Sequence, residues 1–160
     1  MKFLLSIALP MLALDQATKW AILSVSDHDT YWVHTVIPGF FDLVYLQNTG
    51  AAFSIGSGNN TFFVVLSLVT LIGLLIAWVK NVFVDKPSRW AIALLVGGIL
   101  GNVTDRIIHK HVVDFLSFDL HVPMASPWPA FNVADSCIFI AAGLLIIAAI
   151  KEGKEKAVKK

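Results

Sequence analysis

Four apolar stretches, each close to the length of a membrane-spanning helix, constrain the fold of this chain more than any other feature. They run over about residues 3–23, 61–79, 90–108 and 133–150 of the 160. About 20 apolar residues in a helix cross the hydrocarbon core of a bilayer. Because lipid offers no hydrogen bonds to the backbone, such stretches must span it as helices. The sequence therefore predicts an α-helical integral membrane protein with four transmembrane helices in a single domain, residues 1–160.

The amino-acid composition agrees with a membrane location. Hydrophobic residues make up 57% of the chain and charged residues only 14%, whereas about 25% of residues are charged in soluble domains. The single cysteine, Cys137, excludes an internal disulfide, and its apolar surroundings indicate a small buried residue.

Lysine and arginine residues are distributed unevenly along the chain. Of the twelve, nine lie at Lys2, within residues 80–89 and in the tail after residue 150. The positive-inside rule then places both termini and the 80–89 loop in the cytoplasm, and segments 24–60 and 109–132 outside. No small-x-small cleavage site follows the first apolar run, so we interpret it as an uncleaved anchor.

The outer segment 34–55 has a composition typical of β-structure. Aromatic and branched residues fill positions 40–46 after Pro38 and Gly39, and Asn48-Thr49-Gly50 offers turn chemistry. We expect a small extracytoplasmic β-sheet or hairpin that rests on the membrane. Residues 56–60 are predicted to form a glycine-rich turn before the second span, and residues 123–129 a further outer loop.

Four aspartates adjoin the predicted spans, where a charged side chain costs at least about 2.5 kcal/mol. They are Asp15, Asp105, Asp114 and Asp135. Asp15 and Lys19 are four residues apart on one helix face and are predicted to pair, which favours a structural role for both. Asp114 and Asp135 have no adjacent cation in the sequence. Two such carboxyl groups held close together share one proton, and a pair of this kind can activate water against an amide.

Polar residues near the outer end of the third span share one helix face. Asn102, Asp105 and Arg106 occupy positions i, i+3 and i+4. Arg106 can neutralise Asp105, hold a substrate carbonyl or phosphate, or extend to the membrane interface. Asn132, three residues before Asp135, can donate or accept a hydrogen bond and orient that carboxyl group. Three glycines in the third span would let a neighbouring helix approach closely: Gly97, Gly98 and Gly101.

Other hydrolytic chemistries have less support in the sequence. Both glutamates lie in the tail, so a His-Glu-x-x-His metalloprotease site is excluded. His109, His111 and Asp114 could in principle bind zinc, but interfacial histidines without a metal are commoner, and we expect neither metal nor cofactor. The Gly56-Ser57-Gly58 sequence lacks the spacing of a nucleophile elbow.

Five short segments occur in order along the chain, at residues 15–19, 48–53, 97–106, 112–115 and 131–135. They read Asp-Gln-Ala-Thr-Lys, Asn-Thr-Gly-Ala-Ala-Phe, Gly-Gly-Ile-Leu-Gly-Asn-Val-Thr-Asp-Arg, Val-Val-Asp-Phe and Phe-Asn-Val-Ala-Asp. These segments resemble the five ordered boxes of lipoprotein signal peptidase, the bacterial signal peptidase II. The chain departs from the usual family residues at His109-Lys110-His111 and at Thr104, none of which is a catalytic position.

The resemblance implies an aspartic endopeptidase of the bacterial inner membrane. Its substrates would be diacylglyceryl-modified prolipoproteins, cut on the amino side of the lipidated cysteine near the extracytoplasmic face. By similarity the catalytic dyad is Asp114 and Asp135. Supporting positions are Asp15, Lys19, Asn48, Gly50, Asn102, Asp105, Arg106 and Asn132. We expect a monomer in contact with membrane lipids, with no cofactor and no nucleic-acid partner.

A small proton-coupled transporter is the main alternative, with the membrane aspartates as a relay. A relay needs carboxylates at several depths. Asp105, Asp114 and Asp135 instead gather on the outer side, which favours the peptidase.

Overall fold

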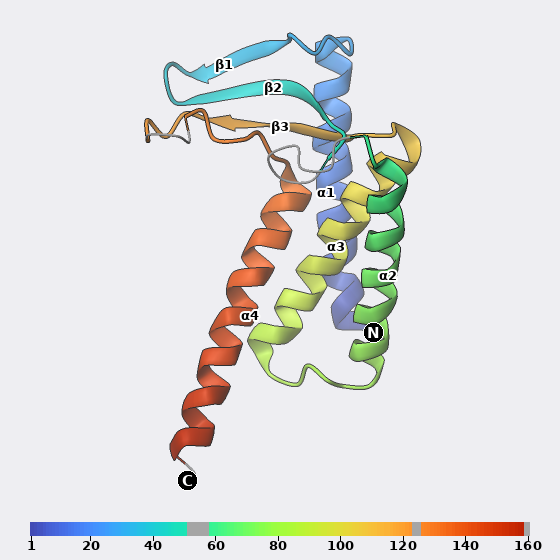
Figure 1. The fold of residues 1–160 in the computed structure, drawn as a ribbon, viewed down its shortest axis with the longest axis vertical. Coiled ribbons are helices and arrows are strands. Elements are labelled where there is room, and N and C mark those ends of the chain that lie inside the picture. The colour runs from blue at the N-terminus through green and yellow to red at the C-terminus, as the bar shows by residue number, and fades with distance from the viewer. Residues whose placement is uncertain (51–57, 123–125, 159–160) are drawn as a thin grey trace.

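The computed structural model of the chain describes residues 1–50, 58–122 and 126–158, with side chains up to residue 154. The helices are α1 (Lys2–Ser26), α2 (Asn60–Val79), α3 (Lys86–Ile108) and α4 (Val133–Val158), and the strands are β1 (Val33–Ile37), β2 (Phe41–Asn48) and β3 (Val112–Phe118). The helices run along the long axis of the molecule and the strands lie across one end of them (Figure 1). The predicted turn at residues 56–60 and the loop at residues 123–129 lie partly outside the described residues.

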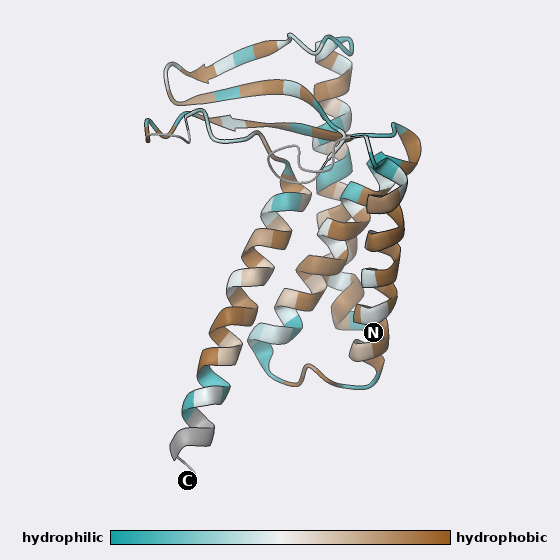
Figure 2. Ribbon diagram, in the orientation of Figure 1, coloured by the Kyte–Doolittle hydropathy of each residue, from teal (hydrophilic) through white to brown (hydrophobic). Residues whose placement is uncertain are grey.

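Three of the described helices are long and apolar enough to cross a membrane. They are α2, α3 and residues Val133–Lys154 of α4. Hydrophobic residues cover much of α2 and α4 (Figure 2), and most of this surface is exposed, as expected of helices that face lipid. Most of α3 is buried, so it is the central helix. The fourth predicted span, α1, has 25 residues and carries the buried charges Asp15 and Lys19.

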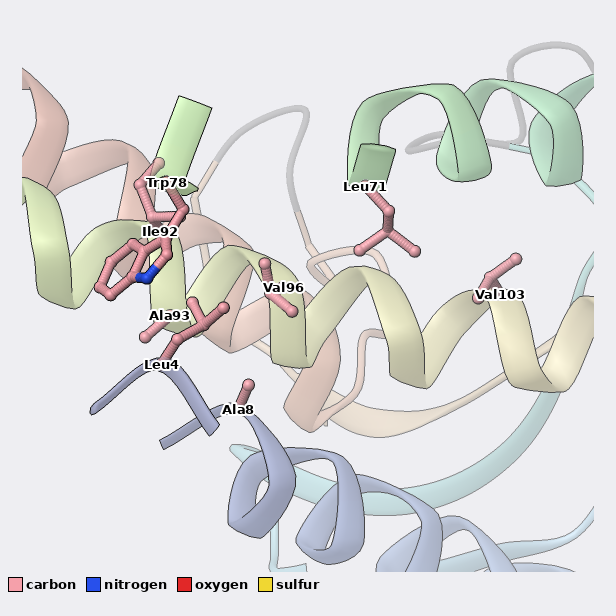
Figure 3. Close-up of a cluster of buried hydrophobic side chains, with 8 residues drawn as sticks. All are labelled: Leu4, Ala8, Leu71, Trp78, Ile92, Ala93, Val96 and Val103. Carbon is pink, nitrogen blue, oxygen red and sulfur yellow. The ribbon is translucent and has the colours of Figure 1, made fainter. Parts of the chain in front are cut away.

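Small residues bring the helices into close contact, as the glycines of the third span predict. A methyl group added at Gly97 would lie 3.0 Å from the carbonyl oxygen of Ala8 in α1, and one at Gly98 only 2.5 Å from that of Ala134 in α4. Apolar side chains fill the space between α1, α2 and α3 (Figure 3). This cluster consists of Leu4, Ala8, Leu71, Trp78, Ile92, Ala93, Val96 and Val103. The close helix contacts allow polar groups on α1, α3 and α4 to meet.

The sheet is antiparallel with strand order β1-β2-β3. The predicted hairpin is confirmed, because β1 and β2 pair and Gly39 adopts the positive φ of 72° that a tight turn requires. The third strand is not predicted from the sequence, which places segment 109–132 outside the membrane and assigns only residues 123–129 to a loop. In β3, Val112 pairs with Asn48 of β2. This pairing joins segments that are separated by the whole of α2 and α3.

Candidate active site

Asp114 is a buried carboxyl group near the start of β3, which is an edge strand of the sheet. Its side chain is 1% exposed in β3. Oδ2 accepts a hydrogen bond of 2.9 Å from Asn48 Nδ2 at the end of β2, and Oδ1 accepts one of 2.7 Å from Asn132 Nδ2. The β2–β3 pairing therefore places Asn48, distant in sequence, beside this carboxyl group.

Asp135 lies in the first turn of α4 and is half-buried. Its Oδ1 accepts a hydrogen bond of 2.7 Å from Asn102 Nδ2 of α3. Its Oδ2 accepts the backbone N–H of Asn132 at 3.3 Å. These hydrogen bonds and the partial positive charge at the start of the helix stabilise the ionised form of this carboxyl group, against the effect of its burial.

Asn132 joins the two aspartates into one site. It is fully buried, and its side-chain amide donates to Asp114 while its side-chain oxygen accepts the backbone N–H of Asp135 at 2.9 Å. Burial, together with the negative charge of Asp135, raises the pKa of Asp114 to about 7. Ionisation of one of these carboxyl groups therefore disfavours ionisation of the other.

Lys19 is a buried cation next to Asn102, the residue that donates to Asp135. Lys19 Nζ is 2.8 Å from Asp15 Oδ2 and 2.9 Å from Asp105 Oδ2, and its side chain is 2% exposed. The predicted pair of Asp15 and Lys19 is thus confirmed. The sequence left open that Arg106 neutralises Asp105, and in the structure Lys19 takes that place.

Lys19 also orients a neighbour of the dyad. Its Nζ donates a hydrogen bond of 3.0 Å to Asn102 Oδ1. Because an ammonium group only donates, it holds the amide oxygen of Asn102 toward itself and turns the amide nitrogen toward Asp135. The charge on Lys19 therefore makes Asn102 present its amide nitrogen, and not its oxygen, to Asp135.

The two carboxylates that flank Lys19 each hold the backbone next to one dyad member. Asp15 Oδ1 accepts the N–H of Ala134, which precedes Asp135, at 2.8 Å. Asp105 Oδ2 accepts the N–H of Val113, which precedes Asp114, at 3.1 Å. Charged acceptors make such bonds short and strong. One ion triad thus fixes the position of both members of the dyad.

Gln16 is a member of this network that the sequence analysis did not single out. Its Nε2 donates to Asp105 Oδ1 at 2.9 Å and to the Gly101 carbonyl at 3.2 Å. The available signal was its place inside the first of the five segments, directly after Asp15. The side chain links α1 to α3 beside the ion triad.

Arg106 faces a different part of the site. Its Nη2 donates to the Gly50 carbonyl at 2.6 Å, and its guanidinium lies 4.7 Å from the centre of the Phe63 ring. The Gly50 N–H in turn binds Asn48 Oδ1 at 3.0 Å. Within the described residues, Nη1 of Arg106 is buried without a hydrogen-bond partner. Together with the bonds described above, these contacts connect the two dyad aspartates and all eight supporting positions in one network of hydrogen bonds and ion pairs.

The described residues hold no cluster of three His, Cys, Asp or Glu side chains placed to bind a metal ion. The ring centres of His109 and His111 are 5.9 Å apart, and His111 Nε2 is 3.4 Å from the Tyr45 hydroxyl. His111 therefore packs against Tyr45 of the sheet and against His109.

Comparison with known proteins decides the family. The model of a family described as Signal peptidase (SPase) II matches residues 7–151. The chain belongs to the signal peptidase II family. A lipoprotein signal peptidase of Aeromonas hydrophila is 41% identical over 150 residues, which cover 89% of this chain and 85% of that protein. One from Neisseria meningitidis serogroup C is also 41% identical, over 158 residues that cover 93% of this chain and 92% of that protein.

Solved structures agree with this family membership. One described as a bacterial membrane enzyme, at 2.3 Å resolution, has a TM-score of 0.86 and 33% identity, covering 98% of this chain and 92% of that one. A second, at 1.9 Å resolution, has a TM-score of 0.81 and 34% identity, with 94% of both chains covered. The prediction of a bacterial membrane-embedded aspartic peptidase of the signal peptidase II family is confirmed, and the transporter alternative has no support.

Proposed function

We propose that the chain removes signal peptides from diacylglyceryl-modified bacterial prolipoproteins, using water activated between Asp114 and Asp135. The cut falls on the amino side of the lipidated cysteine. The observation that carries this proposal is that Asn132 donates to both carboxyl groups, through Nδ2 to the fully buried Asp114 and through its backbone N–H to the half-buried Asp135. The names of the relatives supply the class of substrate.

The shared proton belongs on Asp114 in this mechanism. Burial and the charge of Asp135 favour the neutral form of Asp114. Asp135 accepts hydrogen bonds from Asn102 Nδ2 and the Asn132 N–H, and it lies at the positive end of the α4 dipole. Ionised Asp135 takes a proton from the attacking water as the new C–O bond forms. Asp114 donates its hydrogen to the developing oxyanion. When the C–N bond then breaks, the proton held by Asp135 passes to the leaving amine, and a hydroxyl of the tetrahedral intermediate returns its proton to Asp114, which restores the starting pair. Every step uses the side chains of this chain and water.

The remaining residues of the network position this pair. Asn48 and Asn132 hold Asp114, and Asn102 holds Asp135 in the orientation that Lys19 imposes. Each bond reduces the freedom of a reacting group before substrate arrives.

Arg106 and Gly50 border the segment after β2 and are suited to binding the substrate backbone rather than to proton transfer. An arginine does not exchange protons near neutral pH. The buried and unpartnered Nη1 of Arg106 is a donor that a peptide carbonyl would satisfy.

In the membrane, we place α1 beside the three apolar helices as a fourth span of a single domain. The charges in its middle do not prevent this, because Lys19 is paired with Asp15 and Asp105 inside the protein. Both termini then lie in the cytoplasm, and the sheet and dyad lie at the outer face of the inner membrane. The chain acts as a monomer, since all ten residues of the site come from one copy.

Lipidation of the substrate is a requirement in this arrangement. The dyad lies where the helices meet the sheet, and acyl chains hold the modified cysteine at that depth with about 0.8 kcal/mol per buried methylene. In this arrangement the outer segment 40–60 would clamp the extended signal peptide from above. Residues 51–57 of this segment lie outside the described residues.

Cleavage of a lipidated prolipoprotein by the purified protein tests the proposal. Asp114→Asn and Asp135→Asn should each abolish turnover and leave the folded protein in the membrane, because each removes one half of the acid–base pair. Asp42→Asn, on β2 outside the hydrogen-bonded network, is the matched control. Near-normal turnover by either dyad variant would contradict the assignment, and equal cleavage of an unmodified prolipoprotein would contradict the requirement for lipid.

A further inference from the structure

The guanidinium of Arg89 is held by aromatic rings at the end of the helices opposite the sheet. Its Cζ lies 5.2 Å from the centre of the Phe3 ring and 5.1 Å from that of the Trp78 ring. The two rings are within 3° of parallel, with centres 6.2 Å apart, and Trp90 meets Phe3 edge-on at 5.6 Å. Phe3 of α1 and Trp78 of α2 thus contact a cation of α3. The loop that joins α2 to α3 lies at the end of the helices opposite the sheet (Figure 1).

This guanidinium forms no ion pair with any carboxylate in the described part of the chain, although its side chain is exposed. The nearest acid in sequence, Asp85, accepts the backbone N–H of Ser88 at 2.9 Å and caps α3. Aromatic rings occupy the flat face of a guanidinium and leave its edge donors free. Such an edge fits the oxygens of a phosphate group in a bidentate manner.

Two further cations lie close in sequence to Arg89 or to its aromatic partner Phe3. Lys86 lies one turn earlier in α3, on the same helix face. Lys2 directly precedes Phe3, and both lysines are exposed. Trp90 is 41% exposed at the same level, a position that tryptophan favours at a membrane interface.

We propose that Arg89, with Lys86 and Lys2, binds the phosphate group of an anionic phospholipid in the leaflet at this end of the helices. The bilayer holds the phosphate of a lipid at the membrane interface, the depth that Trp90 favours. A dissolved phosphate ion is not held at that depth. A zwitterionic lipid brings its own cation beside the phosphate, so the site prefers the anionic lipid. The inference depends on the proposed orientation only for which leaflet supplies the lipid.

Native mass spectrometry of the whole chain in a neutral detergent tests this inference. The protein is titrated with phosphatidylglycerol, with phosphatidylcholine of the same acyl chains, and with inorganic phosphate. We expect about fivefold greater retention of phosphatidylglycerol, the effect of one basic residue at an anionic surface. Arg89→Gln should lose most of this preference, whereas Lys110→Gln, an exposed lysine near the sheet, should retain it.

A second variant covers the case in which Arg89→Gln does not fold. Arg89→Lys keeps the charge but not the planar fork, so it should bind phosphatidylglycerol more weakly than the unaltered chain. Equal retention of the two lipids by the unaltered chain, or equal loss in Lys110→Gln and Arg89→Gln, would overturn the inference. Displacement of bound phosphatidylglycerol by millimolar inorganic phosphate would assign the site to the free ion instead. Because no substrate is present, these results do not depend on peptidase activity, and Asp135→Asn should bind lipid normally.

Discussion

Asn132 and Asp135 close a reciprocal pair of hydrogen bonds at the start of α4. The side-chain oxygen of Asn132 accepts the N–H of Asp135 at 2.9 Å, and Asp135 Oδ2 accepts the N–H of Asn132 at 3.3 Å. This is the geometry of a capping box, which normally serves only to begin a helix. Here the same asparagine also binds Asp114 through its amide nitrogen. The start of the helix and the alignment of the dyad therefore depend on one side chain.

Substitution of Asn132 should separate these two roles. Asn132→Ala removes both the cap and the bond to Asp114, so we expect a loss of about 1 kcal/mol in stability and of activity on the order of a hundredfold. Asn132→Ser restores a good helix cap but cannot reach Asp114 in the same way. It should recover the melting temperature and not the kcat. A serine variant that recovers both would show that Asn132 acts only as a cap.

The pH dependence of cleavage should report the proton on Asp114. Since its pKa is raised to about 7, the rate should fall as the pH rises through that value and the acid is lost. The bond from Asn48 favours the charged form and lowers this pKa. Asn48→Ala should therefore move the alkaline limb of kcat/KM upward, by about 0.7 pH unit for a bond of about 1 kcal/mol. Thr49→Ala, at an exposed neighbouring position, is the control. If the alkaline limb of kcat/KM in Asn48→Ala stayed unchanged or moved to lower pH, the assignment of the proton to Asp114 would be refuted.

Two glycines offer a matched test of helix packing. Gly98→Ala places a methyl group 2.5 Å from the Ala134 carbonyl and 2.9 Å from Ile138 Cγ1, so α3 and α4 must separate. We expect a cost of about 1–3 kcal/mol, with reduced activity because Asp135 moves with α4. Gly143→Ala meets nothing within 4 Å and should stabilise the helix by up to about 1 kcal/mol. Thermal unfolding in detergent compares them, and equal melting temperatures would contradict the close contact.

Labelling of single cysteines should establish the orientation in the membrane. In a Cys137→Ala background, a cysteine in place of exposed Asp29 should react with an impermeant maleimide in intact spheroplasts. A cysteine in place of Val84, which is 75% exposed between α2 and α3, should react only after lysis. The positive-inside rule is the physical reason, because cytoplasmic loops retain Lys and Arg. The reverse pattern would refute the proposed topology.

Local pattern was enough to predict much of this protein. The apolar stretches predicted the positions of the helices to within a few residues at most ends, because hydrophobicity and length act locally. The spacing of Asp15 and Lys19 predicted their ion pair, and Pro38-Gly39 predicted the hairpin, for the same reason. The ten candidate site residues were recognisable because each lies in one of the five short segments that occur in order along the chain.

Only the tertiary structure decided how those residues meet. The pairing of β3 with β2 brings Asn48 to Asp114, and a strand partner more than sixty residues away leaves no periodic signal in either segment. The choice of Lys19 rather than Arg106 as the partner of Asp105 likewise depends on the approach of α1 to α3. Sequence determines which groups are available near each helix end. Which of them share a proton, a cation or a hydrogen bond is set by packing between helices, where burial makes each unpaired polar group costly.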